Sequence, residues 1–290
     1  MSKPPRLTLP SVARARRLST DRGDFAVHEA GEAARGTALL VPGFTGSKED
    51  FIALLEPLAA VGYRVVAVDG RGQYETPGPR EESAYALEAL ALDLLAQARA
   101  LDAGPVHLLG HSLGGLISRA AVLRDPAPFA SLTLMSSGPA AISEEQQART
   151  KLLVAALEAL REDMPAVWAA MRAQDPEDAV PDSAELTDFL RERWLATVPE
   201  QLIATGRALI SEPDRVAELA VVPLPKLVLS GAVDYAWPVP LMDDMADRLG
   251  ASRVVVEGAE HSPNAENQQV TAGALAAFWD SCTLWTTHSR

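Results

Sequence analysis

The run from Gly110 to Gly115, which reads GHSLGG, constrains the fold of this chain more than any other segment. A short apolar run typical of a buried strand precedes it, and a helical pattern follows it. A serine on such a sharp turn takes a strained backbone conformation, so its neighbours two positions away must be small. Gly110 and Gly114 satisfy this condition on either side of Ser112. We therefore expect the Ser112 hydroxyl to project from the end of a strand, above the N-terminus of a helix.

Six short apolar runs have the composition of buried parallel strands, and helical patterns lie between them. The runs cover residues 38–41, 64–68, 106–109, 132–135, 226–229 and 253–256. Ahead of them, residues 17–20 and 25–30 flank a polar turn and predict an antiparallel hairpin at the edge of the sheet. The alternation predicts an α/β fold, in which helices cover both faces of a mostly parallel central sheet.

The region from residue 139 to residue 222 lacks a convincing strand pattern, although helical spacing continues through it. Several prolines divide this region into four or five expected helices. Because so long a structureless segment is improbable inside a compact core, we interpret the region as a helical insertion. The expected organisation is a core formed by residues 1–138 and 223–290, with a helical cap formed by residues 139–222.

The composition argues against several classes of function. A formal net charge of −13 at pH 7 is unsuited to binding nucleic acid or an anionic membrane. Cys282 is the single cysteine, and no metal-binding H-E-x-x-H motif, G-x-G-x-x-G motif or P-loop occurs. We therefore expect neither a metal nor a cofactor. The N-terminus does not resemble a secretory signal, and no apolar stretch approaches the length of a transmembrane helix, which predicts a cytoplasmic protein without membrane insertion.

A serine hydroxyl needs a general base to become a nucleophile, and that base needs an acid to orient it. Of five histidines, His261 follows the last predicted strand, where an open α/β sheet places its functional groups. The others fall in a strand, in the edge hairpin, beside the serine or near the C-terminus. Asp234 follows the preceding strand, although it could instead cap the next helix. Asp69 and Glu257 also lie near strand ends, but the order Ser…Asp…His favours Asp234.

An oxyanion that develops on a substrate carbonyl needs two backbone N–H donors. We expect one from Leu113, at the start of the helix after the serine, and one from Phe44, in the loop after the first core strand. In that loop, Gly43 supplies the freedom to turn. The expected substrate pocket includes Thr45 and His111 beside these groups, and Trp168 and Trp194 from the insertion.

Together these segments resemble the α/β-hydrolase fold enzymes, with motifs spread over residues 38–280. GHSLG matches the family's nucleophile elbow, GAVD its acid loop and GAEH its histidine loop. In the oxyanion loop, Pro42 stands where this family often has histidine. The turn DGRG resembles a further family motif, but continues as Gln73-Tyr74-Glu75 where the family usually has Gly-x-Ser. The helical insertion occupies the position of the family's cap.

The resemblance implies a cofactor-independent serine hydrolase that cleaves a carboxylic ester of a small to medium hydrophobic substrate, through an acyl-enzyme on Ser112. Epoxide hydrolases and haloalkane dehalogenases of this fold use an aspartate nucleophile, which the serine argues against. A carbon–carbon bond hydrolase or lyase with the same triad remains an alternative, as does a non-catalytic binding protein on a hydrolase scaffold. The expected partner is a small-molecule substrate, and the sequence does not predict an oligomeric state.

Overall fold

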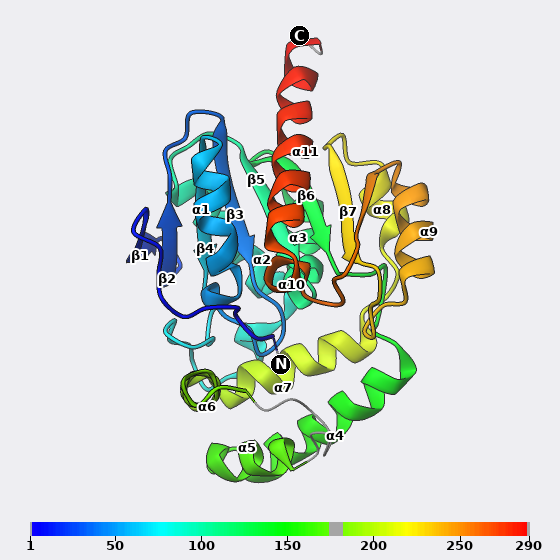
Figure 1. Cartoon of the computed structure of the whole chain (residues 1–290). Coiled ribbons are helices and arrows are strands. Elements are labelled where there is room, and N and C mark those ends of the chain that lie inside the picture. Colours follow the sequence, from blue (N-terminus) through cyan, green and yellow to red (C-terminus); the bar gives the residue numbers. More distant parts are fainter. Residues whose placement is uncertain (1, 174–181, 289–290) are drawn as a thin grey trace.

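The computed structural model describes residues 2–173 and 182–288, and within these ranges eight strands form one sheet. In chain order the strands are β1 (Ala13–Thr20), β2 (Gly23–Ala30), β3 (Gly36–Val41), β4 (Tyr63–Val68), β5 (Val106–His111), β6 (Phe129–Met135), β7 (Lys226–Gly231) and β8 (Ser252–Val256). They lie in the order β1-β2-β4-β3-β5-β6-β7-β8 (Figure 1). The β1–β2 and β2–β4 pairs are antiparallel, and all other neighbouring pairs are parallel. The predicted edge hairpin and mostly parallel sheet are confirmed.

Helices cover both faces of the sheet. One face carries α1 (Ile52–Ala60) and α11 (Gln268–His288), and the other carries α2 (Leu87–Ala100), α3 (Leu113–Arg124) and α9 (Val239–Leu249) (Figure 1). Short helical turns η1 (Lys48–Phe51), η2 (Glu82–Tyr85) and α10 (Pro263–Glu266) complete the core. In β3, Leu39 packs into one layer and Leu40 into the other. Burial on both faces explains why the strands read as continuous apolar runs.

Five helices lie between β6 and β7 in the described residues. They are α4 (Glu144–Leu160), α5 (Met164–Arg172), α6 (Ala184–Ala196), α7 (Pro199–Ser211) and α8 (Val216–Ala220). Residues 174–181, between α5 and α6, lie outside the described ranges. Side-chain caps mark several of their starts, because Ser143, Asp163 and Ser183 each accept a backbone hydrogen bond from the first turn. Proline opens α7 at its first position.

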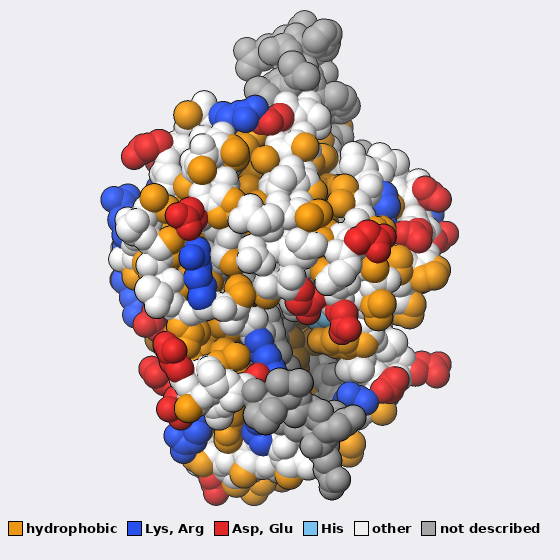
Figure 2. Space-filling view, viewed as in Figure 1, with side chains coloured by type: hydrophobic (Ala, Val, Ile, Leu, Met, Phe, Trp, Pro, Cys, Tyr) orange, Lys and Arg blue, Asp and Glu red, His pale blue; other side chains and the backbone are white. Residues whose placement is uncertain are grey.

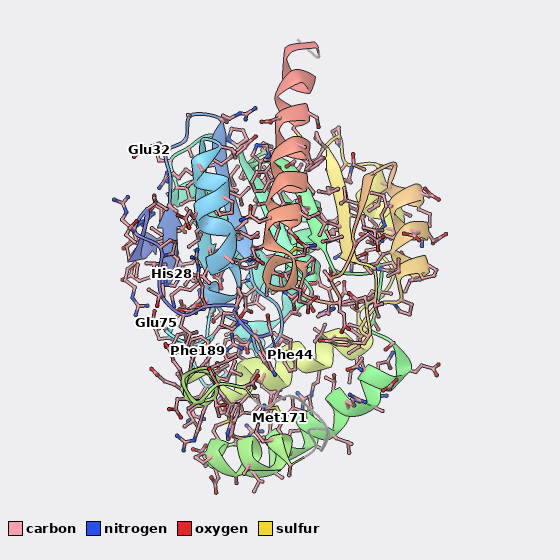
Figure 3. All side chains as sticks on the ribbon, viewed as in Figure 1. His28, Glu32, Phe44, Glu75, Met171 and Phe189 are labelled. Atoms are coloured by element: carbon pink, nitrogen blue, oxygen red, sulfur yellow. The ribbon has the colours of Figure 1, made fainter. Side chains whose placement is uncertain are left out.

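The carboxyl ends of the parallel strands meet at one edge of the sheet, and α7 crosses that edge (Figure 1). Phe44 lies between the strand ends and α7 (Figure 3), and its ring is close to Gly206 of that helix. On the face shown in Figure 2, acidic and basic side chains are interspersed over most of the surface. In the described residues, no helix is both long and apolar enough to cross a membrane.

Candidate active site

Ser112 occupies the strained turn that the sequence predicts. Its backbone has φ 55° and ψ −120°, in the left-handed half of conformational space, and it is the residue before α3. A side chain at Gly110 would collide with the carbonyl of Gly114, and one at Gly114 would collide with the carbonyl of Val41. The two glycines are therefore required by the close approach of three backbone segments. The turn holds Ser112 against a cavity of about 160 Å³.

His261 lines the same cavity and is held from behind by Asp234. The Nδ1 atom of His261 lies 2.9 Å from Oδ2 of Asp234, and both side chains are buried. The second carboxylate oxygen accepts the N–H groups of Ala236 at 2.8 Å and Trp237 at 3.0 Å. Asp234 thus closes a local turn ahead of α9 and also faces the histidine, and it does not cap that helix, which was its alternative role. A neutral His261 with its proton on Nδ1 leaves Nε2 free to accept a proton.

The rival acids lie elsewhere. Asp69 accepts the backbone N–H of Lys48 at 2.7 Å and its ammonium at 2.9 Å. That lysine also pairs with Glu49 and Glu75. Burial alone would lower the pKa of Lys48, but the facing carboxylates raise it. Glu257, the other rival, is exposed. Of the acids considered from the sequence, the structure brings only Asp234 to His261.

His111 supports the histidine loop as well as lining the cavity. Its Nε2 atom lies 2.8 Å from the carbonyl oxygen of His261, and the two ring centroids are 5.1 Å apart. Burial lowers the pKa of His111 to about 3, so the ring is neutral at ordinary pH. Because a carbonyl can only accept, the His111 proton is on Nε2. Its Nδ1 atom is buried and has no partner among the described residues.

The predicted oxyanion donors lie on the two segments nearest the serine. Phe44 and Thr45 line the cavity, in a turn closed by the Gly46 N–H, which donates to the Gly43 carbonyl at 3.1 Å. Thr45 has φ 59°, a conformation that is strained for a residue with a branched side chain. Leu113 is the first residue of α3, where helical N–H groups have no partner within the helix.

Trp168 and Trp194 do not line this cavity, which corrects the expectation for those two residues. They lie on α5 and α6, with ring centroids 6.2 Å apart, in a separate apolar cluster. The Trp194 indole N–H donates to the Met164 carbonyl at 3.1 Å. The insertion instead reaches the cavity through α4 and α7. Its lining residues there include Gln146, Thr150 and Leu209.

Sequence reasoning missed the rest of the cavity wall. Ile142, just ahead of α4, contributes apolar surface, and Tyr235 packs against His261 with ring centroids 4.8 Å apart. The position of Tyr235 directly after Asp234 could have indicated this contact. Nothing in the helical pattern of α4 or α7 marks which side chains face the serine.

Residues 38–273 match the family model of the alpha/beta hydrolase fold. The chain is 32% identical over 219 residues to a pimeloyl-[acyl-carrier protein] methyl ester esterase of Aeromonas hydrophila, covering 71% of this chain and 81% of that protein. It is 33% identical over 138 residues to a 2-hydroxy-6-oxononadienedioate/2-hydroxy-6-oxononatrienedioate hydrolase of Paraburkholderia xenovorans, covering 46% and 47%. A solved carboxylesterase structure from Nitrososphaera gargenis has the same fold, with a TM-score of 0.74 at 21% identity over 92% of this chain and 99% of that one. The chain therefore belongs to the α/β-hydrolase fold family.

Proposed function

We propose that this protein is a cofactor-independent serine hydrolase that cleaves a carboxylic ester through an acyl-enzyme on Ser112. The observation that carries the proposal is the shared cavity of Ser112 and His261, with the Nδ1 atom of His261 held by Asp234 at 2.9 Å. A strained serine beside an oriented imidazole is the arrangement that activates a hydroxyl at neutral pH.

In the proposed reaction, Oγ of Ser112 attacks the ester carbonyl carbon while Nε2 of His261 takes the hydroxyl proton. The Asp234 carboxylate stabilises the resulting imidazolium. The N–H groups of Phe44 and Leu113 stabilise the negative oxygen of the tetrahedral intermediate. Its collapse breaks the bond to the alcohol, which leaves with the proton from His261. Water then attacks the acyl-enzyme by the same steps and releases the carboxylic acid.

The cavity favours a small, uncharged group next to the ester. Its volume of about 160 Å³ is below the range of roughly 300–1,000 Å³ that is usual for drug-sized ligands. Phe44, Ile142 and Leu209 make part of the wall apolar, and none of the described Lys, Arg, Asp or Glu residues lines it. We propose that residues 139–222 act as a cap, since α4 and α7 supply part of this wall. The methyl ester named for the Aeromonas relative is consistent with a small alcohol group.

The hydrolase of Paraburkholderia gives a specific reason to keep a second candidate, a carbon–carbon bond hydrolase with the same three residues. A panel of p-nitrophenyl esters graded by acyl length, set beside a vinylogous 1,5-diketone, separates the two functions. The proposal predicts turnover of short-chain esters that is lost in Ser112→Ala. Turnover of the diketone without ester hydrolysis would select the alternative, and no turnover with no serine-probe labelling would indicate a binding protein.

A further inference from the structure

We infer that Gln73 is a positioning residue of the oxyanion hole, which orients the peptide group between Gly43 and Phe44. This inference rests on the proposed function, because it assigns a role in stabilising the tetrahedral intermediate. Gln73 lies in the segment after β4 where the sequence departs from the pattern that its family resemblance implies. It is 5% exposed and does not line the cavity beside Ser112.

Both ends of the Gln73 side-chain amide are engaged. Its Oε1 atom accepts the Gly70 N–H at 2.9 Å, and its Nε2 atom donates to the Gly43 carbonyl at 3.0 Å. The backbone N–H of Gln73 closes the same tight turn on the Gly70 carbonyl at 3.0 Å. Because one neighbour can only donate and the other can only accept, the hydrogen bonds themselves determine which way the amide faces. Gln73 therefore links the turn after β4 to the loop after β3.

The consequence for Phe44 follows from the planarity of the peptide bond. In a trans peptide, the carbonyl and the N–H point in opposite directions. The Gly43 carbonyl faces Gln73 and the Gly46 N–H, so the N–H of Phe44 is directed away from them. Phe44 lines the cavity, and none of the described residues accepts a hydrogen bond from its N–H. Hydrogen bonds to the carbonyl also polarise the peptide, which strengthens the N–H as a donor.

Gly43 explains why such a support is needed. A side chain there would come within 3.0 Å of the Ser112 Cβ, so the close approach of loop and elbow favours glycine. Glycine, however, restricts the backbone least, and the peptide that follows it can rotate at low cost. The bond from Gln73 removes this freedom without placing any atom in the cavity. Its role is to hold a donor in place before the substrate binds, because donors that are already oriented stabilise a developing charge most effectively.

The test compares Gln73→Met and Gln73→Glu with a matched control, Gln97→Met. Gln97 is 1% exposed and, like Gln73, lines a small cavity of about 20 Å³. It makes no hydrogen bond to the loop after β3. We expect kcat for a short-chain ester to fall roughly 10- to 100-fold in Gln73→Met with KM little changed, less than the loss on deleting a donor. Affinity for a boronic acid that forms a tetrahedral adduct should fall with kcat. Gln97→Met should keep kcat within about two-fold, since the buried Oε1 of Gln97 accepts no hydrogen bond from the described residues.

Gln73→Glu gives a second readout if the methionine variant does not fold. It keeps the acceptor for Gly70, and its carboxyl can donate to the Gly43 carbonyl only when protonated. The ratio of its kcat to that of the wild type should therefore fall as pH rises from about 5 to about 9. A pH-independent ratio, or equal kcat values in Gln73→Met and Gln97→Met, would overturn the inference while leaving the proposed function intact. A wild-type protein without ester hydrolysis or serine labelling would overturn both.

Discussion

The strand-end loops and the helical insertion are held together in different ways. In the loops, polar side chains bond to backbone groups, as when Asp234 accepts two N–H groups and His111 faces the carbonyl of His261. In the insertion, α5 and α6 pack around Trp168 and Trp194, which form an apolar cluster away from the cavity. We therefore expect the proposed chemistry to depend on the strand-end loops of the core. The insertion contributes the part of the cavity wall that can vary.

The largest expected effect lies in the core. Asp234→Asn should lower kcat by roughly 10⁴-fold, because an amide neither stabilises the imidazolium nor favours the required tautomer. Glu257→Gln is the matched control, since Glu257 is exposed and lies one loop away along the chain. It should change kcat by less than about two-fold. Steady-state kinetics on one short-chain ester measures both variants, and the reverse order would mean that the acid has been assigned to the wrong loop.

The next largest effect is expected at the buried ion pair that connects the insertion to the core. Arg193 on α6 donates to the Asp50 carboxylate at 2.8 Å, and these side chains are 1% and 0% exposed. Arg193→Met leaves Asp50 buried without its cation and should lower the free energy of unfolding by roughly 3–5 kcal/mol. Arg149→Met, which removes the exposed i, i+4 pair with Glu145 on α4, should cost about 0.5 kcal/mol or less. Similar urea midpoints for both variants would show that the buried pair does not couple insertion to core.

The pH dependence of stability should also separate the regions, because all five histidines lie outside residues 139–222. Burial in β5 lowers the pKa of His107 from 6.5 to about 4. Below pH 6.5 the unfolded chain binds a proton that the folded chain does not, so stability is full above this pH and falls as pH drops towards 4. Between about pH 8 and pH 5, His107 accounts for a loss of about 2 kcal/mol. In urea unfolding, His107→Gln should not show this loss of stability between pH 8 and pH 5. A pH dependence equal to that of the wild type would contradict the assignment of the loss to His107.

The smallest effect concerns substrate size. Leu209 on α7 lines the cavity, so Leu209→Ala should raise kcat/KM for a longer acyl chain relative to a shorter one by roughly 10-fold. Trp168→Phe should leave this ratio unchanged and lower only stability, because the indole packs inside the insertion. The same panel of p-nitrophenyl esters measures both. If Trp168→Phe shifted the profile and Leu209→Ala did not, the division of the insertion into wall and packing would be reversed.

Much of the core could be predicted from the sequence because its constraints are local. The strands of a parallel sheet are buried on both faces, so they read as short apolar runs, and the glycines around Ser112 mark a turn that no larger residue fits. Ser112, Asp234 and His261 each follow an expected strand in the sequence, and in the structure they follow β5, β7 and β8. The observed distance between the acid and the histidine agrees with that prediction. Their catalytic roles remain a proposal.

The part of the cavity wall that the insertion supplies could not be predicted, because it depends on how separate helices cross. The amphipathic pattern of α5 gives an apolar face for Trp168, but not whether that face meets the cavity or another helix of the insertion. The contact of Gln73 with Gly43 joins residues thirty positions apart on different loops. Only the pairing of β3 with β4 in space brings those loops together.

The central claim is that Ser112 is an activated nucleophile, and the most direct test is covalent labelling with a fluorophosphonate followed by mass spectrometry of the peptides. The account predicts one adduct, on Ser112, in the wild-type protein. It predicts none in Ser112→Ala, and labelling slowed by roughly 10³-fold or more in His261→Ala, where the general base is missing. Labelling of a different serine, or an equal rate in His261→Ala, would contradict the account.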